Sequence, residues 1–271
     1  MKIAITGSNG FIGSALKETC IQEGIETIGL CRNPTANDTL FDLNDPMTFK
    51  NIPNDVTALV HAAYTTQAKD LKKSSQANIE GSKALFDFCH KARILIIFFS
   101  SCSAHENAKS FYGRSKYQLE KYLLATDTII RPGFVIGDGG IYKRLENSIK
   151  TLKFAPLFWG GQQPIQIIHL DELVEGILSA LKNNHTGAYT LAHPTPLTIQ
   201  AFYTQIFEKL DLSPRFLKFP GDLTLLALKV AEFLNIPLPL TSENLLGLQY
   251  PKVFVSDCAK LGNEPGFLRK L

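Results

Sequence analysis

Short apolar runs and amphipathic stretches alternate through the first half of the chain. The runs have the length of strands and cover residues 2–6, 27–31, 57–62, 94–99 and 128–131. Between and after them, apolar residues recur at the spacing of a helix face over 11–23, 78–90 and 112–124. Strands that alternate with helices predict a parallel sheet with helices on both faces. Uninterrupted apolar strands agree, because parallel strands are buried on both sides.

After about Gly137 this regularity loosens. Further strands are expected over 165–168 and 188–191, and further helices over 171–181, 199–210 and 223–234. We therefore predict an α/β fold with a Rossmann-type doubly wound parallel sheet over 1–137. A smaller C-terminal α/β region over 138–271 is expected to bind the substrate, and its part from Ile165 to Leu181 is expected to return partly to the core.

The helix expected over 223–234 is apolar on much of its circumference. We expect it to be buried in the fold. A lid over the site, a dimer contact and contact with a membrane surface are the alternatives.

Composition narrows the class of protein. Of 271 residues, 45% are apolar and 20% are charged, the balance of a globular protein. The 28 Lys and Arg against 25 Asp and Glu leave a net charge of +3, which gives no electrostatic case for a nucleic-acid partner. Five widely spaced cysteines without a C-x-x-C pair predict reduced thiols in the cytoplasm rather than disulfides or zinc. No histidine pattern indicates another metal site, and no apolar run reaches the roughly 20 residues of a membrane helix.

A glycine-rich turn follows the first predicted strand and opens the first predicted helix. Glycines allow the backbone to turn tightly and to approach a pyrophosphate, and the helix N-terminus offers free N–H groups to that anion. The context predicts dinucleotide binding rather than a merely structural turn. The residues expected at the cofactor are Gly7, Ser8, Asn9, Gly10, Phe11, Ile12 and Gly13.

The end of the second strand bears on cofactor choice. An acidic residue there would bind the ribose of NAD, but the chain has Cys31 followed by Arg32. Arg32 could pair with the 2′-phosphate of NADP, so we expect NADP(H) rather than NAD(H); a solvated surface arginine is the alternative. Asp42 and Leu43 are expected near the adenine, although Asp42 could equally belong to a turn.

Tyr112 and Lys116 are four residues apart on a predicted helix, so both side chains reach one point. An ammonium beside a phenol favours the phenolate and so suits the tyrosine to acid–base work. The alternative is an ordinary surface pair. Ser101 lies in a serine cluster at the end of the strand before this helix, where open α/β sheets bind ligands.

With these motifs the chain resembles the short-chain dehydrogenase/reductases, and more narrowly the NAD-dependent epimerase/dehydratase family of sugar-nucleotide enzymes. The resemblance covers nearly the whole chain. It is carried by the glycine turn, the Tyr-x-x-x-Lys pair and several shorter motifs, which are His61-Ala62-Ala63, Asn78-x-x-Gly81, Ser100-Ser101, Arg131-Pro132-Gly133, Gly137 and His169-Leu170-Asp171-Glu172-Leu173.

The resemblance implies roles for particular residues. Tyr112 would be the general acid/base, Lys116 would bind the nicotinamide ribose and lower the tyrosine pKa, and Ser101 would be the catalytic serine. A slip of one residue would move that last role to Ser100 or Cys102. Further cofactor contacts are implied at Ala62, Ala63, Tyr64, Asn78, Pro132 and Gly133.

The expected function is an NAD(P)-dependent oxidoreductase that acts on a carbonyl or carbinol carbon, with a nucleotide sugar as the candidate substrate. Ser101 and Tyr112 are only 11 residues apart, closer than in extended members, and the missing acid at Cys31 fits a reductase that exchanges NADPH. The alternatives are an epimerase or dehydratase that retains NAD, and a non-catalytic dinucleotide-binding subunit of an assembly. A homodimer is compatible with the sequence.

Overall fold

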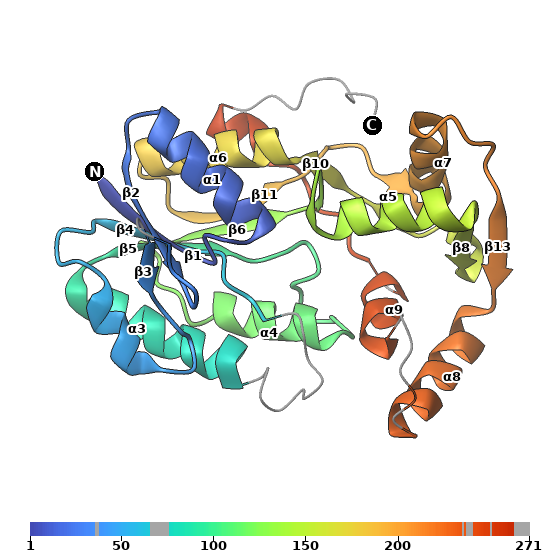
Figure 1. Ribbon diagram of the computed structural model, residues 1–271, viewed down its shortest axis with the longest axis horizontal. Helices are drawn as coiled ribbons and strands as arrows, with labels where there is room; N and C mark the ends of the chain where they lie inside the picture. The colour runs from blue at the N-terminus through green and yellow to red at the C-terminus, as the bar shows by residue number, and fades with distance from the viewer. Residues whose placement is uncertain (36–37, 66–75, 235, 237–240, 250, 263–271) are drawn as a thin grey trace.

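The computed structural model describes residues 1–35, 38–65, 76–234, 236, 241–249 and 251–262. At its centre the described chain forms a seven-stranded sheet in the order β11-β6-β5-β4-β1-β2-β3 (Figure 1). Every pair of neighbouring strands in it is parallel. The strands are β1 (Lys2–Thr6), β2 (Glu26–Cys31), β3 (Asp38–Leu40), β4 (Ala58–His61), β5 (Leu95–Phe99), β6 (Thr128–Pro132) and β11 (Gly187–Leu191).

Helices cover both faces of this sheet, as Figure 1 shows. On one face α1 (Phe11–Gln22) lies beside α6 (Leu170–Lys182), and Leu16 and Ile177 share a buried cluster. The other face is covered by α3 (Ser82–Ala92) and α4 (Phe111–Glu120), which bury Phe86 and Leu119. The predicted α/β class and the doubly wound arrangement are therefore confirmed.

The C-terminal half builds a second core from α5 (Gly140–Leu152) and α7 (Ile199–Lys209), with Tyr142, Ile149 and Phe202 buried together. Its short strands pair two by two. They are β7 (Phe134–Ile136) with β10 (Ile167–His169), β8 (Ala155–Phe158) with β13 (Phe216–Phe219), and β9 (Pro164–Ile165) with β12 (Leu197–Thr198). The remaining turns of helix are η1 (Pro46–Asn51), η2 (Gln76–Gly81), η3 (Trp159–Gly161) and η4 (Cys258–Leu261).

Several later segments return to the main sheet. β11 pairs with β6, and Leu173 and Leu181 of α6 join the buried cluster against α1. Cys258 and Leu261 of η4 join the same cluster. Residue 137 stays our proposed boundary between the two parts of the chain. α6 follows that boundary in the sequence and yet packs on the first part.

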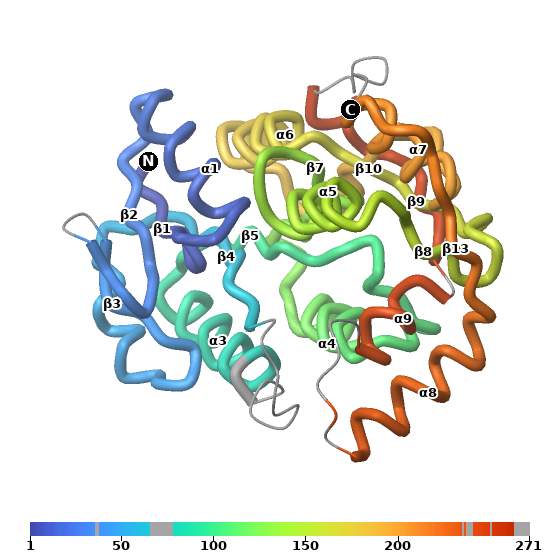
Figure 2. Tube along the Cα trace, turned by 45° about the vertical axis from the view of Figure 1, so that its right-hand side comes forward, coloured from blue at the N-terminus to red at the C-terminus, as the bar shows by residue number. Residues whose placement is uncertain are grey.

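The helix α8 (Gly221–Phe233) lies at the rim of the molecule, next to α9 (Ser242–Gln249) (Figure 2). The expectation that this helix is buried is wrong for half of its circumference. Leu228 is buried, but Leu223, Leu226 and Phe233 are 65%, 61% and 84% exposed. The physical reason is that α8 is apolar on two sides and packs with only one of them. No helix of the described chain is long and apolar enough to cross a membrane.

Candidate active site

The carboxyl ends of β1, β4, β5 and β6 lie at one edge of the sheet because these neighbouring strands run parallel. Most of the predicted site residues follow these ends directly. The fold thus brings the glycine turn, the loop after His61, the serine cluster after Phe99 and Pro132 to the same edge, where open α/β sheets bind ligands.

Two glycines of the turn are required by its backbone geometry, and a third leaves its backbone accessible. Gly7 has φ +69°, and a Cβ on Gly13 would overlap the carbonyl oxygen of Gly7, so both are required by the turn itself. Gly10 precedes α1 in an extended conformation, and its N–H donates to Gly7 O at 2.8 Å. A Cβ on Gly10 would meet only that oxygen, at 3.1 Å. The described chain therefore leaves the backbone at Gly10 open to a ligand.

Phe11 joins the glycine turn to the C-terminal half. A Cβ on Gly139 would overlap the Phe11 ring, and one on Gly140 would lie 2.7 Å from it. The ring thus packs on the turn that opens α5. Because only glycine leaves room for it, the start of α1 and the start of α5 are held together at the edge of the site.

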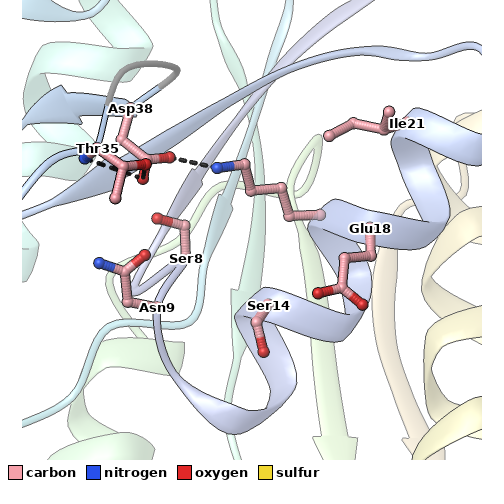
Figure 3. Close-up of a pocket in the computed structure, with 8 residues that line it drawn as sticks. Ser8, Asn9, Ser14, Glu18, Ile21, Thr35 and Asp38 are labelled. Carbon is pink, nitrogen blue, oxygen red and sulfur yellow. Dashed lines mark hydrogen bonds and ion pairs between the residues drawn. The ribbon is translucent and has the colours of Figure 1, made fainter.

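A cavity of about 360 Å³ lies beside the glycine turn (Figure 3). Three charged side chains line it, those of Lys17, Glu18 and Asp38. Lys17 forms an ion pair with Asp38, and Thr35 Oγ1 donates to Asp38 at 2.8 Å. Ser8 is 1% exposed, and its Oγ has no hydrogen-bond partner in the described chain. An unpaired buried hydroxyl beside an open helix N-terminus suits the polar part of a dinucleotide. The cavity is lined by Ser8, Asn9, Ser14, Lys17, Glu18, Ile21, Thr35 and Asp38.

Sequence reasoning missed Asp38. It looked for an acid at the end of β2, whereas this acid lies on β3 and pairs in register with Gly29. A Cβ on Gly29 would overlap Asp38 Oδ1, so the glycine makes room for the carboxylate. A glycine inside a strand often marks such a close approach, and this was the available signal.

The residues predicted around the adenine have other contacts. Arg32 follows β2 and is exposed, and Asn9 Nδ2 donates to Asn33 O next to it at 3.4 Å. Asp42 Oδ1 accepts from the N–H of Asn44 at 2.9 Å, which is the turn that was the alternative for this residue. Leu43 is buried in the core. Adenine contacts by Arg32, Asp42 and Leu43 remain proposals.

The loop after β4 is held from both sides. A Cβ on Gly7 would lie 2.9 Å from Ala63 Cα, so the glycine turn rests on this loop. Asn78 is buried; it accepts from the N–H of Thr65 at 2.8 Å and donates to Thr65 O at 3.0 Å. Asn78 therefore shapes the loop that carries Ala62, Ala63 and Tyr64, and any effect of Asn78 on a cofactor would pass through that loop.

A buried histidine supports the same loop. His61 Nδ1 lies 2.8 Å from Thr6 Oγ1, and its Nε2 lies 2.9 Å from Ser82 Oγ. Burial lowers the pKa of His61 to about 3, so the ring is neutral at physiological pH. His61 thus ties β1, β4 and α3 together and is not a proton donor for the site.

Tyr112 lies in the first turn of α4, which begins where Ser110 Oγ accepts from the N–H of Gly113. The Ser101 side chain is hydrogen-bonded to the Tyr112 hydroxyl, and the ring of Tyr64 lies edge-on at 4.9 Å. Desolvation raises the pKa of Tyr112 to about 12, and the Ser101 bond opposes the rise. The residue as a whole is still 37% exposed.

Lys116 is buried one turn further along α4. Its Nζ donates to Phe99 O at 2.6 Å and lies 4.9 Å from the centre of the Tyr64 ring. Burial lowers the pKa of Lys116 to about 7, against the opposing influence of Glu120. Lys116 is not among the groups that shift the pKa of Tyr112 in the described chain, where its ammonium donates to Phe99 O instead.

A buried acid completes the cluster, and sequence reasoning did not single it out. Glu120 binds Arg131 with two hydrogen bonds, Nε to Oε1 at 2.8 Å and Nη2 to Oε2 at 2.6 Å. Ser100 Oγ also donates to Glu120 Oε1. Ser100 is thereby committed to Glu120, and Cys102 Sγ donates to Arg131 O. Of the three residues considered for the catalytic hydroxyl, Ser101 is the one beside Tyr112.

Pro132 and Gly133 close the site at the end of β6. The N–H of Cys102 donates to Pro132 O at 3.1 Å, which fixes the serine cluster to β6. A Cβ on Gly133 would lie 2.6 Å from O of Gln166, the residue between β9 and β10, so this glycine is required by the packing of that segment. Contacts of Pro132 and Gly133 with a nicotinamide remain a proposal.

The curated proteins that are similar to this chain include two reductases or dehydrogenases of lipids by name. The ceramide reductase of Caulobacter vibrioides is 28% identical over 149 residues, which are 51% of this chain and 47% of that protein. The decarboxylating sterol-4-alpha-carboxylate 3-dehydrogenase of Dictyostelium discoideum is 22% identical over 254 residues, 78% of this chain and 77% of that protein. The matched region thus covers less than two thirds of the length of the Caulobacter protein and more than two thirds of the length of the Dictyostelium protein.

Solved structures show the same fold. The UDP-glucose 4-epimerase of Thermus thermophilus, in complex with NAD, superposes with a TM-score of 0.75 at 19% identity and covers 98% of this chain and 94% of that one. Residues 3–192 match the model of the NAD dependent epimerase/dehydratase family, a stretch that runs from β1 past the end of β11 and includes Tyr112 and Lys116. The chain therefore belongs to the NAD dependent epimerase/dehydratase family and is an enzyme of the extended short-chain dehydrogenase/reductase type.

Proposed function

We propose that this enzyme is an NADP(H)-dependent oxidoreductase that acts on a carbonyl or carbinol carbon. The observation that carries the proposal is the joint position of Ser101, Tyr112 and Lys116 at the carboxyl edge of the sheet, beside the glycine turn. When bound there, the nicotinamide would supply or accept the hydride. The protein's part is to orient the substrate oxygen and to move its proton.

The side chains divide this work. The Tyr112 hydroxyl would donate a proton to the substrate oxygen in reduction and accept it in oxidation. Ser101, hydrogen-bonded to that hydroxyl, would hold the same oxygen in place. Lys116 would bind the nicotinamide ribose, and with a pKa of about 7 it is able to exchange a proton near neutral pH.

We also propose that the dinucleotide bound is NADP(H) rather than NAD(H). Residues of the glycine turn, with the open Gly10 and the unpaired Ser8 hydroxyl, would hold the dinucleotide. Arg32 is exposed at the end of β2 and would meet the 2′-phosphate of NADP. Asp38 and Glu18 line the cavity nearby as acids, and Lys17 forms an ion pair with Asp38. The exposed guanidinium of Arg32 is the group that would favour NADP(H) over NAD(H).

The substrate class has two candidates. A nucleotide sugar is favoured by the structural similarity to a UDP-glucose 4-epimerase. An apolar ketone or alcohol is favoured by the two curated relatives, which are named for a ceramide and a sterol. We propose a cytoplasmic location for either case, since the five cysteines are free, as in a reducing compartment.

The test is a hydride-transfer assay with the purified full chain. NADPH and NADH oxidation would be followed with keto-sugar nucleotides and with sterol and sphingoid ketones. Turnover with NADPH that disappears in Tyr112→Phe supports the proposal. A stoichiometric dinucleotide that copurifies and does not exchange with added NADPH would contradict it in favour of an epimerase that retains its cofactor.

A further inference from the structure

The first turn of α4 is held by a carboxylate from the far end of the chain. Within the turn, Ser110 Oγ accepts from the N–H of Gly113 at 3.1 Å. The N–H of Phe111 donates to Glu243 Oε2, 132 residues further along. The first N–H groups of a helix have no partner inside that helix, so each needs an acceptor from elsewhere. Ser110 and Glu243 each supply one to the helix that carries Tyr112.

The support that presents Glu243 belongs to the C-terminal half. Glu243 is the second residue of α9, which lies beside α4 (Figure 2). At the start of α9, the N–H and the Oγ of Ser242 donate to the carboxylate of Glu232 on α8 at 2.7 Å each. At its end, Gln249 Nε2 donates to Asp222 of α8 at 3.2 Å. Helix α9 is thus hydrogen-bonded to α8 at both ends.

The pair of helices is docked in turn on the segment that follows β8. Leu245 of α9 and Leu228 of α8 are buried together with Phe158. Trp159 Nε1 donates to Asp222 at 3.2 Å, and a Cβ on Gly221 would overlap the Trp159 ring. The carboxylate of Glu243 is therefore presented to α4 from a support that is fixed by packing and by hydrogen bonds.

From within the first half, the same turn of α4 rests on the loop that carries Ser101. A Cβ on Gly113 would overlap the carbonyl oxygen of Ser103, so only glycine allows this close approach. The N–H of Ser103 donates to Ser101 Oγ at 3.1 Å. The position of Tyr112 therefore depends on two contacts of its helical turn, one with the loop that also holds Ser101 and one with Glu243.

We propose that Glu243 is a positioning residue of the site, which fixes the first turn of α4 and so holds the Tyr112 hydroxyl beside Ser101. This inference rests on the proposed role of Tyr112 in proton transfer. The glycine turn and α1 take no part in the contacts described above. Loss of Glu243 should therefore lower turnover and leave cofactor binding in place, since displacing a reacting group by ~1 Å can cost about a hundredfold in rate.

The competing account is that Glu243 acts only by its charge. A carboxylate stabilises a helix N-terminus without a specific hydrogen bond. Desolvation and, to a lesser extent, the charge of Glu243 raise the pKa of Tyr64, whose ring lies against Tyr112. The placement of one oxygen on the N–H of Phe111 favours the hydrogen bond. The two accounts differ in what can replace Glu243, because glutamine keeps the reach of the oxygen without the charge, whereas aspartate keeps the charge and is one methylene shorter.

The test compares Glu243→Ala, Glu243→Asp and Glu243→Gln with the wild type, each as the full chain. Fluorine NMR of protein that carries 3-fluorotyrosine at its eight tyrosines reports the surroundings of Tyr112, whose signal is identified by its absence from Tyr112→Phe. This signal should shift or broaden in the alanine and aspartate variants and stay as in the wild type in Glu243→Gln. The control is Glu208→Ala, which removes an exposed acid of α7 and should leave the signal unchanged.

Kinetics and calorimetry give the second measurement. In the alanine and aspartate variants kcat should fall by about ten- to a hundredfold, and in Glu243→Gln it should recover to within about threefold of the wild type. The dissociation constant of NADPH should stay the same in all of these proteins. A loss that was merely structural would weaken NADPH binding together with kcat.

A Tyr112 signal that stays in place in Glu243→Ala overturns the inference, whether or not a substrate is known. So does a wild-type kcat in Glu243→Ala. An aspartate variant that keeps its activity while Glu243→Gln loses it assigns the effect to charge and also overturns the inference. If the wild type turns over none of the substrates, the proposed function fails and the Tyr112 signal alone decides here. Should thermal unfolding show that Glu243→Ala does not fold, Glu243→Asp takes its place.

Discussion

Lys116 directs its ammonium at the main chain of Phe99, with Nζ 2.6 Å from the carbonyl oxygen. The rings of Phe98 and Tyr64 lie 4.7 and 4.9 Å from the same nitrogen. This packing fixes Lys116 where β5 ends, next to the serine cluster. It also removes water from the charge, which is why the pKa of Lys116 falls to about 7.

The lowered pKa of Lys116 predicts a pH dependence of stability. Between pH 7 and the ordinary lysine value of 10.5, the unfolded chain binds a proton that the folded protein does not. The free energy of unfolding contributed by this group therefore rises with pH across that window. Lys116→Met removes the titration. Between about pH 7 and pH 9 in urea unfolding, the free energy of unfolding of the wild type should rise relative to that of the variant, by on the order of 1 kcal/mol per pH unit. If both proteins change in stability with pH in the same way, the assignment is contradicted.

The Glu120–Arg131 pair should stabilise the fold and position Lys116. Glu120→Gln leaves the Arg131 guanidinium, whose side chain is 24% exposed, without its charged partner and weakens two charge-assisted hydrogen bonds, so it should cost about 1.5–3 kcal/mol. Glu120→Gln/Arg131→Met should recover part of that loss, since no unpaired charge remains. Urea unfolding of the three proteins measures both effects. The control is Glu23→Gln, whose pair with Lys182 is exposed and whose loss should leave the unfolding curve unchanged. A double variant less stable than Glu120→Gln contradicts this account.

The order of strands and helices in the first half could be predicted because each element carries its own signal. The strands are apolar throughout, and the glycine turn has a fixed spacing. α5 was missed although Tyr142, Ile149 and Leu152 have helical spacing, because two glycines precede it and a third is its first residue. Local pattern is sufficient when an element is buried along its whole length, as β4 is.

Long-range contacts were beyond local reasoning. The distance between Asp38 and Ser8 depends on the register of β3 with β2, which no local pattern encodes. Glu120 has the spacing of a surface pair with Lys116, and only the position of Arg131 on β6 buries it. The burial expected for α8 was wrong. An apolar helix sequence indicates that some side of the helix packs on a partner, but it does not tell how many sides do.

Arg32 should set the preference for NADP. Losing a charge-assisted bond to phosphate typically costs ~1.5–3 kcal/mol, so Arg32→Ser should weaken NADP binding by about tenfold or more. NAD affinity should stay unchanged, because NAD has no 2′-phosphate. Titration calorimetry with both dinucleotides measures this. The matched control is Arg93→Ser, an exposed arginine at the end of α3. Equal dissociation constants of NADP and NAD for the wild type would remove the basis of the idea.

Gly10 and Gly13 should fail in different ways. Gly10→Val puts side-chain atoms on a backbone that only Gly7 O approaches, and its conformation is accessible to other residues. Folding should therefore survive while dinucleotide affinity falls below detection. Gly13→Val would drive atoms into Gly7 and should destabilise the protein itself. Thermal unfolding and calorimetry separate the two; unchanged NADPH binding by a folded Gly10→Val protein would show that the cofactor lies elsewhere.

Tyr112 should be required for turnover and not for folding. Tyr112→Phe keeps the ring against Tyr64 and removes the hydroxyl that would transfer the proton. General acid–base catalysis is typically worth 10²–10⁴-fold, so kcat should fall by about that factor while NADPH affinity is kept. Ser101→Ala acts on the same oxygen, so the double variant should lose little beyond Tyr112→Phe alone. The control is Tyr122→Phe, a tyrosine of nearly equal exposure whose hydroxyl donates to Asp87 outside the site. Wild-type turnover in Tyr112→Phe would assign the proton transfer to another group.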